Sequence, residues 1–237
     1  MFSTKGGAGR TTLAANLAVA FALQNRRTAL VDYDLHSGDV DQVLGLAPEK
    51  TIDDLIQEED YAKAEEYFTV FDEHLSVLTS PTRPEPALRL DSAASAEILT
   101  GLRHSYDFIV VDLPATLANH VAGALETADF IGLVTGNDIL SVKNAVFALQ
   151  SLALLGYDLQ AIRLVANPFD RRGLTTVEMS AAIGLPVYWS FDRDENLLDS
   201  LNRSKPVVID KPRSSMSVDI KRLASALAIE YGKVRKE

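Results

Sequence analysis

A glycine-rich stretch near the start of the chain has the residue types that hold phosphate. It reads KGGAGRTT over residues 5–12, with a lysine before three glycines and two threonines after them. Glycines allow a tight loop whose backbone N–H groups converge on phosphate oxygens. Two hydroxyls at the expected start of a helix can then reach Mg²⁺ and phosphate. The stretch predicts a nucleotide-binding loop made of Lys5, Gly6, Gly7, Ala8, Gly9, Arg10, Thr11 and Thr12.

The stretch differs from the P-loop pattern GxxxxGK[ST] at two positions. Lys5 adds a lysine at the entrance of the loop, and Arg10 stands where the pattern has lysine. Lysine acts on phosphate as a compact point charge, whereas arginine is a longer planar fork. Binding can rely on backbone N–H groups, but catalysis is sensitive to shifts near 1 Å. We therefore expect nucleotide to bind and its hydrolysis to be weak.

Two apolar runs end in aspartate. Residues 28–32 lead into Tyr33 and Asp34, and residues 108–112 end at Asp112. Carboxylates at the C-terminal ends of parallel strands point into the crevice where nucleotides bind. A lone strand-end aspartate is more often a turn or cap residue, but an acid beside a P-loop usually holds Mg²⁺ and its water. The pattern predicts Thr11, Asp34 and Asp112 as the metal-site residues.

Strand and helix patterns alternate along the whole chain. Apolar runs predict further strands at 75–78, 130–135, 162–166 and 187–190, and helical spacing predicts helices at 11–25, 92–105, 139–155 and 175–183. This alternation predicts an α/β fold with a mostly parallel, doubly wound sheet flanked by helices on both faces. No linker rich in Pro, Gly or Ser divides the 237 residues, so we expect a single domain over 1–237.

Three motifs in this order resemble one family of ATPases: residues 5–12, Asp32-Tyr33-Asp34 and Val111-Asp112-Leu113-Pro114. Together they look like the deviant-Walker ATPases of ParA and MinD type, and the resemblance covers essentially the whole chain. It implies a P-loop NTPase fold of MinD/ParA type, ATP and Mg²⁺ as cofactors, and a homodimer that forms on ATP binding. It also implies roles for single residues. Lys5 would reach the partner's phosphates, Asp34 would position the attacking water, and Asp112 would hold the Mg²⁺ shell.

Two segments bear on the nucleotide base. Asn167 ends a predicted strand, and its amide can pair with both a donor and an acceptor of adenine. In the family an asparagine at the matching position contacts the base, although Asn before Pro168 is also typical of a turn. The segment from Asp192 to Pro206 resembles the family's second adenine-side segment, with Asp192 where that segment usually has proline. Asn167 and Pro206 are therefore included among the nucleotide-binding residues.

Further motifs are similar to the CpaE/TadZ branch, pilus-assembly proteins that localise the Tad (Flp) secretion machinery. They are DLHSGDV at 34–40, TIDDL at 51–55, LTSP at 78–81 and LETAD at 125–129. The branch implies a cytoplasmic localisation factor that is recruited to a cell pole and contacts pilus and secretion proteins. Its members commonly carry a receiver-like domain before the ATPase domain. Only three residues precede Thr4, whereas strands usually have about five or six, so we expect a truncated first strand and a missing receiver-like domain.

Two functions remain open from the sequence. One is an ATP-binding dimer switch with weak hydrolysis at most, and the other is a working ATPase of the ParA type that partitions DNA. Partition ATPases bind DNA through a basic surface near the C-terminus. Residues 171–237 carry 12 Lys/Arg against nine Asp/Glu, but the whole chain has a net charge of −10. Because interleaved acids and overall negative charge repel phosphate backbones, we do not expect DNA binding.

The remaining composition excludes other classes. Cysteine is absent, which rules out disulfides and thiolate-held Fe–S clusters. The four histidines lack metal-ligand spacing, and we interpret each as a surface or capping residue. The C-terminal stripe of Ile220, Leu223, Ala224, Leu227 and Tyr231 has helical spacing typical of a core-packing face. The polar residues after it are too few to anchor a membrane, so no direct membrane anchor is predicted in this chain.

Overall fold

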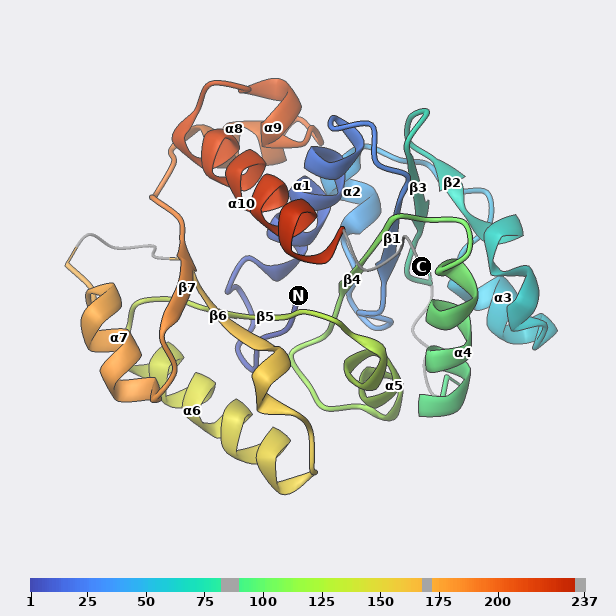
Figure 1. Cartoon of the computed structure of the whole chain (residues 1–237). Coiled ribbons are helices and arrows are strands. Elements are labelled where there is room, and N and C mark those ends of the chain that lie inside the picture. The colour runs from blue at the N-terminus through green and yellow to red at the C-terminus, as the bar shows by residue number, and fades with distance from the viewer. Residues whose placement is uncertain (82–89, 168–171, 233–237) are drawn as a thin grey trace.

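A central β-sheet with helices on both faces organises the protein (Figure 1). The computed structural model describes residues 1–81, 90–167 and 172–232. Four strands lie in the order β2-β3-β1-β4 and three in the order β5-β6-β7, parallel throughout except for β2 against β3. The strands are β1 (Thr28–Asp32), β2 (Thr69–Val70), β3 (Leu75–Leu78), β4 (Phe108–Asp112), β5 (Ile131–Thr135), β6 (Ile162–Ala166) and β7 (Val187–Ser190).

The first residues of the chain join the two groups of strands. The Met1 nitrogen donates to the Val111 carbonyl of β4 at 2.6 Å. On the other side, the Phe2 N–H donates to the Gly132 carbonyl of β5 at 2.9 Å, and the Val134 N–H donates to the Phe2 carbonyl at 2.8 Å. The glycine-rich loop follows directly, so the sheet itself fixes where the loop emerges at the carboxyl ends of β4 and β5.

Helices cover the two faces of the sheet in two groups. One face packs on α1 (Arg10–Ala22), α2 (Val40–Leu44), α8 (Asn196–Leu201), α9 (Val207–Asp210) and α10 (Ser215–Tyr231). The other packs on α3 (Ile52–Glu58), η1 (Tyr61–Tyr67), α4 (Ser92–Leu102), α5 (Asn119–Thr127), α6 (Ile139–Leu154) and α7 (Thr176–Ile183), with the short η3 (Leu159–Ala161) after α6. Both faces of the sheet are therefore buried, as the apolar strands require, and the doubly wound α/β class is confirmed.

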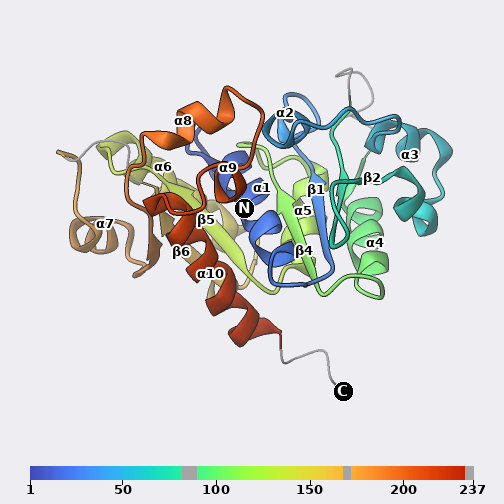
Figure 2. The same ribbon diagram turned by 90° about the horizontal axis from the view of Figure 1, so that it is seen from above.

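Helix α10 lies along α1, as Figures 1 and 2 both show. Its residues Ile220, Leu223, Ala224 and Leu227 are buried in the core with α1. The expected core-packing role of this stripe is confirmed. No helix within the described ranges is long and apolar enough to cross a membrane.

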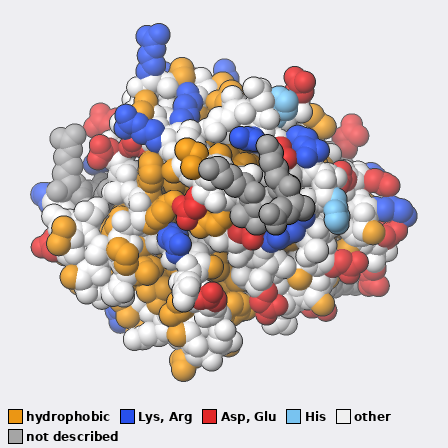
Figure 3. Space-filling view, in the orientation of Figure 1, with side chains coloured by type: hydrophobic (Ala, Val, Ile, Leu, Met, Phe, Trp, Pro, Cys, Tyr) orange, Lys and Arg blue, Asp and Glu red, His pale blue; other side chains and the backbone are white. Residues whose placement is uncertain are grey.

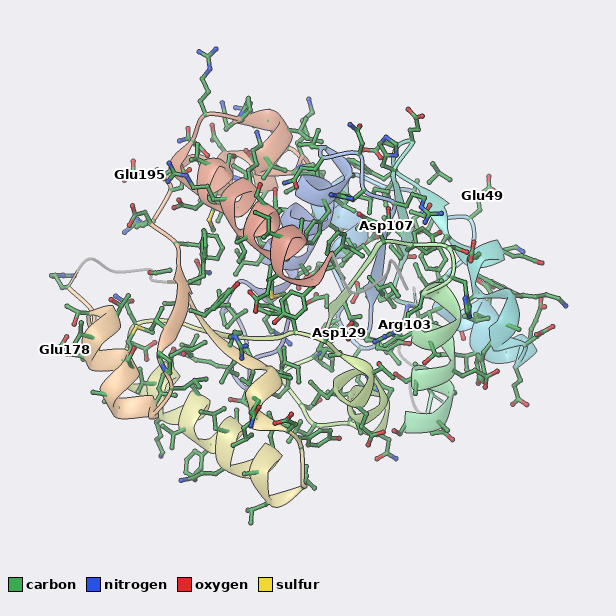
Figure 4. The ribbon with its side chains drawn as sticks, viewed as in Figure 1. Glu49, Arg103, Asp107, Asp129, Glu178 and Glu195 are labelled. Atoms are coloured by element: carbon green, nitrogen blue, oxygen red, sulfur yellow. The ribbon has the colours of Figure 1, made fainter. Side chains whose placement is uncertain are left out.

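A cavity of about 170 Å³ lies between β4 and β5 at their amino ends. Phe21, Phe108, Phe130 and Tyr231 are among its apolar lining residues. Apolar side chains gather near the middle of the face seen in Figure 3. At the rim Arg103 pairs with Asp129 at 3.3 Å, and both are labelled in Figure 4. The cavity is lined by none of the residues expected to bind nucleotide.

The predicted elements agree with the structure to within three residues at each end. Five of the six predicted strands outside the loop have the observed bounds, and the expected strand 130–135 begins one residue later, at Ile131. Helix α1 ends at Ala22 rather than at Asn25, because Asn25 has a left-handed backbone with φ 56°. Helix α7 begins with a capping box in which Thr175 and Glu178 bind each other's backbone.

Candidate nucleotide-binding site

The glycine-rich loop presents an open helix N-terminus. Gly7 and Gly9 have left-handed backbones, with φ 75° and 87°, and α1 begins at the next residue, Arg10. No side chain among the described residues caps this helix end. A Cβ built on Gly6 or Gly7 would meet nothing within 4 Å. Free N–H groups and open space at a helix N-terminus suit an anion such as phosphate.

Asn167 lies against the loop from the end of β6. Its Nδ2 donates to the Ala8 carbonyl at 2.9 Å, and a Cβ on Gly9 would come within 2.4 Å of the same nitrogen. Only glycine at position 9 allows this close approach. The structure therefore brings the predicted base-contacting amide to the phosphate loop, and its contact with adenine remains a prediction. Its neighbour Pro168 lies outside the described residues.

The segment of Pro206 is tied to α1. Pro206 is buried and precedes α9. Two residues later the Val208 N–H donates to Asn16 Oδ1 at 3.2 Å, while Asn16 Nδ2 donates to the Thr12 carbonyl at 2.8 Å. Asn16 thus links the segment of Pro206 to the end of the loop. Asn16 was not predicted as a site residue, although a fully buried polar residue within an apolar helix is an available signal.

Thr11 and Asp112 are the predicted metal residues that the structure places in contact. Thr11 Oγ1 donates to Asp112 Oδ2 at 2.6 Å. The other oxygen, Asp112 Oδ1, is buried without a hydrogen-bond partner in the described part of the chain. Burial raises the pKa of Asp112, and the hydrogen bond from Thr11 opposes that rise. A buried, unsatisfied carboxylate oxygen is costly unless a cation or water completes it.

Asp32 lies next to this pair at the end of β1. It is fully buried and accepts from the Asp34 and Val40 N–H groups at 3.0 and 3.3 Å. Burial, followed by the charge of Asp112, raises the pKa of Asp32 well above its usual value. Asp32 therefore holds the backbone that carries Asp34, and its charge is disfavoured beside Asp112.

Arg10 and Asp34 face each other within the site. Arg10 is buried, with 8% of the residue exposed, and its Nη2 lies 3.7 Å from Asp34 Oδ2. Its Nη1 donates to the Leu113 carbonyl, directly after β4. Asp34 also accepts from the Ser37 N–H and Oγ at 3.3 and 3.2 Å. The structure thus places Asp34 beside Arg10, whereas Thr11 and Asp112 form a pair of their own.

Lys5 contacts the start of α6 within the same chain. Its Nζ lies 3.1 Å from Asp138 Oδ2 and 2.9 Å from Ser141 Oγ. Asp138 also caps α6 by accepting from the Leu140 and Ser141 N–H groups. Partial burial raises the pKa of Asp138, but hydrogen bonds from Ser141 and Lys5 outweigh it and lower the value to about 2. These α6 partners could not be found from the sequence, because they lie 133 and 136 positions from Lys5.

The residues present fit a nucleotide with Mg²⁺. The open loop suits phosphate, and the unsatisfied Asp112 oxygen beside the Thr11 hydroxyl suits a hard cation or its water. Within residues 1–81, 90–167 and 172–232, no group of three or more acidic or His side chains is arranged to hold a metal by itself. A bound Mg²⁺ would therefore need phosphate oxygens and water as further ligands, as is usual for this ion.

One histidine differs from its expected surface or capping role. His120 is only 3% exposed, and its Nε2 donates to the Tyr33 carbonyl at 3.0 Å, beside the site. The interpretation of His120 as a surface residue was wrong, because α5 turns this side chain into the core. Burial lowers the pKa of His120, so the ring is held neutral with its proton on Nε2.

The sheet order, the loop and the strand-end carboxylates define a P-loop nucleotide-binding protein. The chain belongs to the family described as the CobQ/CobB/MinD/ParA nucleotide binding domain, whose model matches residues 1–207. The resemblance to ParA and MinD proteins is thus confirmed at the level of this family.

Three proteins are similar to this chain, one by sequence and two by structure. An uncharacterized ATP-binding protein of Methanocaldococcus jannaschii is 25% identical over 95% of this chain and 85% of its own length. A ParA family ATPase from Chlorobium tepidum has a TM-score of 0.87 at 24% identity, covering 94% of this chain and 98% of that one. MinD from Pyrococcus horikoshii, solved with Mg-ADP, has a TM-score of 0.85 at 24% identity and covers both chains fully. The expected cofactors, ATP and Mg²⁺, agree with this family.

Proposed function

We propose that the protein is an ATP-binding localisation factor of the CpaE/TadZ type, which dimerises on ATP, serves pilus assembly and hydrolyses ATP weakly at most. The family membership supports the nucleotide site. The pilus role rests on the motifs at 34–40, 51–55, 78–81 and 125–129. Genes for pilus secretion next to this one would support the role. A neighbouring gene for a centromere-binding protein would contradict it.

The position of Arg10 carries the proposal of weak hydrolysis. A loop lysine places a point charge on the β- and γ-phosphates, but the guanidinium here is directed at Asp34 and the Leu113 carbonyl. Asp34 is the acid proposed to orient the attacking water. On phosphate, the longer planar guanidinium does not place its charge as the compact ammonium of a lysine does, and catalysis is sensitive to shifts near 1 Å. Binding through the backbone N–H groups of Gly6 to Thr11 does not depend on this side chain.

The other site residues take the following roles in this proposal. The N–H groups of the loop and of α1 bind phosphate, and the Thr11 hydroxyl with Asp112 holds the metal shell. Asn167 and the segment of Pro206 bind the base. Lys5 exchanges Asp138 for the partner's phosphates when two copies meet. Bound ATP would supply phosphates for the loop N–H groups and for Lys5 of the other copy.

Thermal unfolding with and without MgATP tests the nucleotide site. A ligand that binds only the folded state raises the melting temperature, and at 100 times Kd the gain is about 2.7 kcal/mol. We expect a rise with millimolar MgATP. No rise would remove the nucleotide function.

Hydrolysis by Arg10→Lys tests the weak-ATPase half of the proposal. The substitution restores a point charge, and a tenfold gain in rate would correspond to about 1.4 kcal/mol of transition-state stabilisation. The gain should disappear in an Arg10→Lys, Asp34→Ala double variant. A robust wild-type rate that falls on substitution would contradict weak hydrolysis and favour a working ATPase.

The second candidate function is a ParA-type partition ATPase, because a ParA family ATPase is among the structures that share this fold. Two arginines near the C-terminus are paired with acids in the described part of the chain: Arg203 with Asp199 at 3.2 Å and Asp210 at 3.7 Å, and Arg222 with Asp219 at 3.7 Å. Such pairing leaves less charge for phosphate backbones, so we expect weak DNA binding at physiological salt. Submicromolar binding to random duplex that falls steeply with added salt would favour partition instead.

A further inference from the structure

Arg10 joins three segments that converge on the nucleotide site. Residue 10 begins α1, Asp34 follows β1, and Leu113 follows β4. One arm of the guanidinium is anchored by a hydrogen bond to the Leu113 carbonyl. The other arm faces the Asp34 carboxylate at 3.7 Å, which is an ion-pair distance but longer than a hydrogen bond. The side chains of Arg10 and Asp34 are only 9% and 12% exposed.

The surroundings of the pair would allow a bound phosphate to replace Asp34 as the partner of Arg10. The Arg10 guanidinium is the nearest described partner of opposite charge for Asp34, and a buried charge without a partner is strongly disfavoured. A guanidinium donates to a carboxylate or to a phosphate with similar geometry, since its planar fork fits both. It lies at the first residue of the helix whose free N–H groups attract phosphate. Phosphate in the loop and the Asp34 carboxylate would therefore compete for the Arg10 guanidinium.

We propose that Arg10 is a positioning residue that locks Asp34 beside the Leu113 carbonyl in the nucleotide-free protein, and that bound phosphate competes with Asp34 for its guanidinium. This inference rests on the proposed nucleotide function. It adds that nucleotide binding releases Asp34 from its ion pair with Arg10. Phosphate binding would thereby change the contacts of Arg10 with the segments after β1 and β4. A loop lysine that contacts only phosphate would not couple the two.

Competition has a measurable signature in nucleotide affinity. In Asp34→Asn the competing carboxylate is lost, so ADP should bind about fivefold to tenfold more tightly than to the wild type. Part of any gain could come from weaker general repulsion between Asp34 and phosphate. In an Arg10→Gln background the lock is absent and only that general part remains. We therefore expect the Asp34→Asn gain to fall below twofold there.

The competition is tested by calorimetric titration of ADP into four proteins: the wild type, Asp34→Asn, Arg10→Gln and the double variant. Magnesium is present throughout. The matched control is the exposed pair of Arg27 and Asp107, whose charged atoms lie 3.0 Å apart away from the loop. Arg27→Gln and Asp107→Asn should leave ADP affinity unchanged. Equal gains from Asp34→Asn in both backgrounds would overturn the competition. No ADP binding by any variant would instead overturn the proposed nucleotide function, and the competition with it.

A second measurement tests the lock without nucleotide. Thermal unfolding of the apo proteins should show that Arg10→Gln and Asp34→Asn each lower the melting temperature, and that the double variant loses clearly less than the sum. Additive losses would mean that the two side chains do not interact, and would overturn the lock even if nucleotide binds normally. Singly substituted proteins too unstable to purify, beside a stable double variant, would count as the same coupling.

Discussion

Lys5 and Asp138, 133 positions apart, form an ion pair at 3.1 Å within one chain. The proposed dimer requires Lys5 to leave this pair for the phosphates of the other copy. Both side chains are about one-third exposed, at 36% and 31%. Exposed pairs contribute about 1 kcal/mol or less. The ion pair therefore orders Lys5 in the single chain but is weak enough to break when a dimer forms.

We expect Lys5→Ala to abolish ATP-dependent dimerisation while leaving the monomer folded. Asp138→Asn should act in the opposite direction, because it removes the competing charge while asparagine still caps α6. Since each pair contributes about 1 kcal/mol at most and a dimer breaks two of them, the dimer constant should tighten by no more than roughly 30-fold. Sedimentation velocity with MgATP measures both. Dimers of Lys5→Ala that form as well as wild type would remove Lys5 from the site.

Thr11→Val should weaken the magnesium dependence of nucleotide binding. The substitution removes the hydroxyl that donates to Asp112 at 2.6 Å and leaves both carboxylate oxygens of this buried acid without a donor. It should therefore raise the pKa of Asp112 further and lower its affinity for a cation. Titrations of ADP with magnesium and with EDTA should differ less in the variant than in the wild type.

Gly9→Ala should destabilise the protein even without nucleotide. A left-handed backbone costs a non-glycine residue roughly 1–2 kcal/mol, and Gly9 has φ 87°. The added Cβ would also lie 2.4 Å from Asn167 Nδ2. Removing that amide in a Gly9→Ala, Asn167→Ala double variant should recover the steric part and leave the backbone part. Urea unfolding measures both. A double variant no better than the single one would mean that the backbone alone sets the cost.

His120 should make the protein less stable in mild acid. Burial lowers its pKa in the folded state below the usual 6.5. The unfolded chain therefore binds a proton that the folded protein rejects, and stability falls as pH drops below about 6.5. His120→Gln keeps an N–H donor for the Tyr33 carbonyl without the titration. The stability difference between the two proteins should change between pH 7 and pH 5 in favour of the variant. A constant difference would contradict a neutral buried ring.

Local patterns predicted most of the fold. Strands β1 and β4 are short apolar runs that end in aspartate, and both were predicted with their observed bounds. Helices α5, α8 and α9 were not predicted, because they are short and their apolar residues repeat over too few turns. In α5, Gly123 is required by tertiary packing, since a Cβ there would lie 2.1 Å from the Ser92 carbonyl of α4. Because this contact is with another helix, the sequence around Gly123 does not indicate it.

The site residues were predicted better than their partners. Loop glycines, threonines and strand-end acids have types and spacing that indicate chemistry directly. The sequence could not show that Arg10 turns to Asp34 and Leu113, or that Lys5 turns to Asp138, because the order of strands in the sheet decides which chain segments meet. The position of Arg10 was recognised as unusual, but its burial against an acid depends on β1 and β4 being neighbours.

The seam of Met1 and Phe2 between β4 and β5 also bears on folding kinetics. This segment can pair only when two strands about 110 and 130 residues further along the chain have come together. Closing such distant contacts is slow relative to local helix formation. The phosphate loop follows the seam directly and is therefore expected among the last parts to become ordered. A ligand in that loop would act after the folding barrier, so it should slow unfolding and leave the refolding rate nearly unchanged.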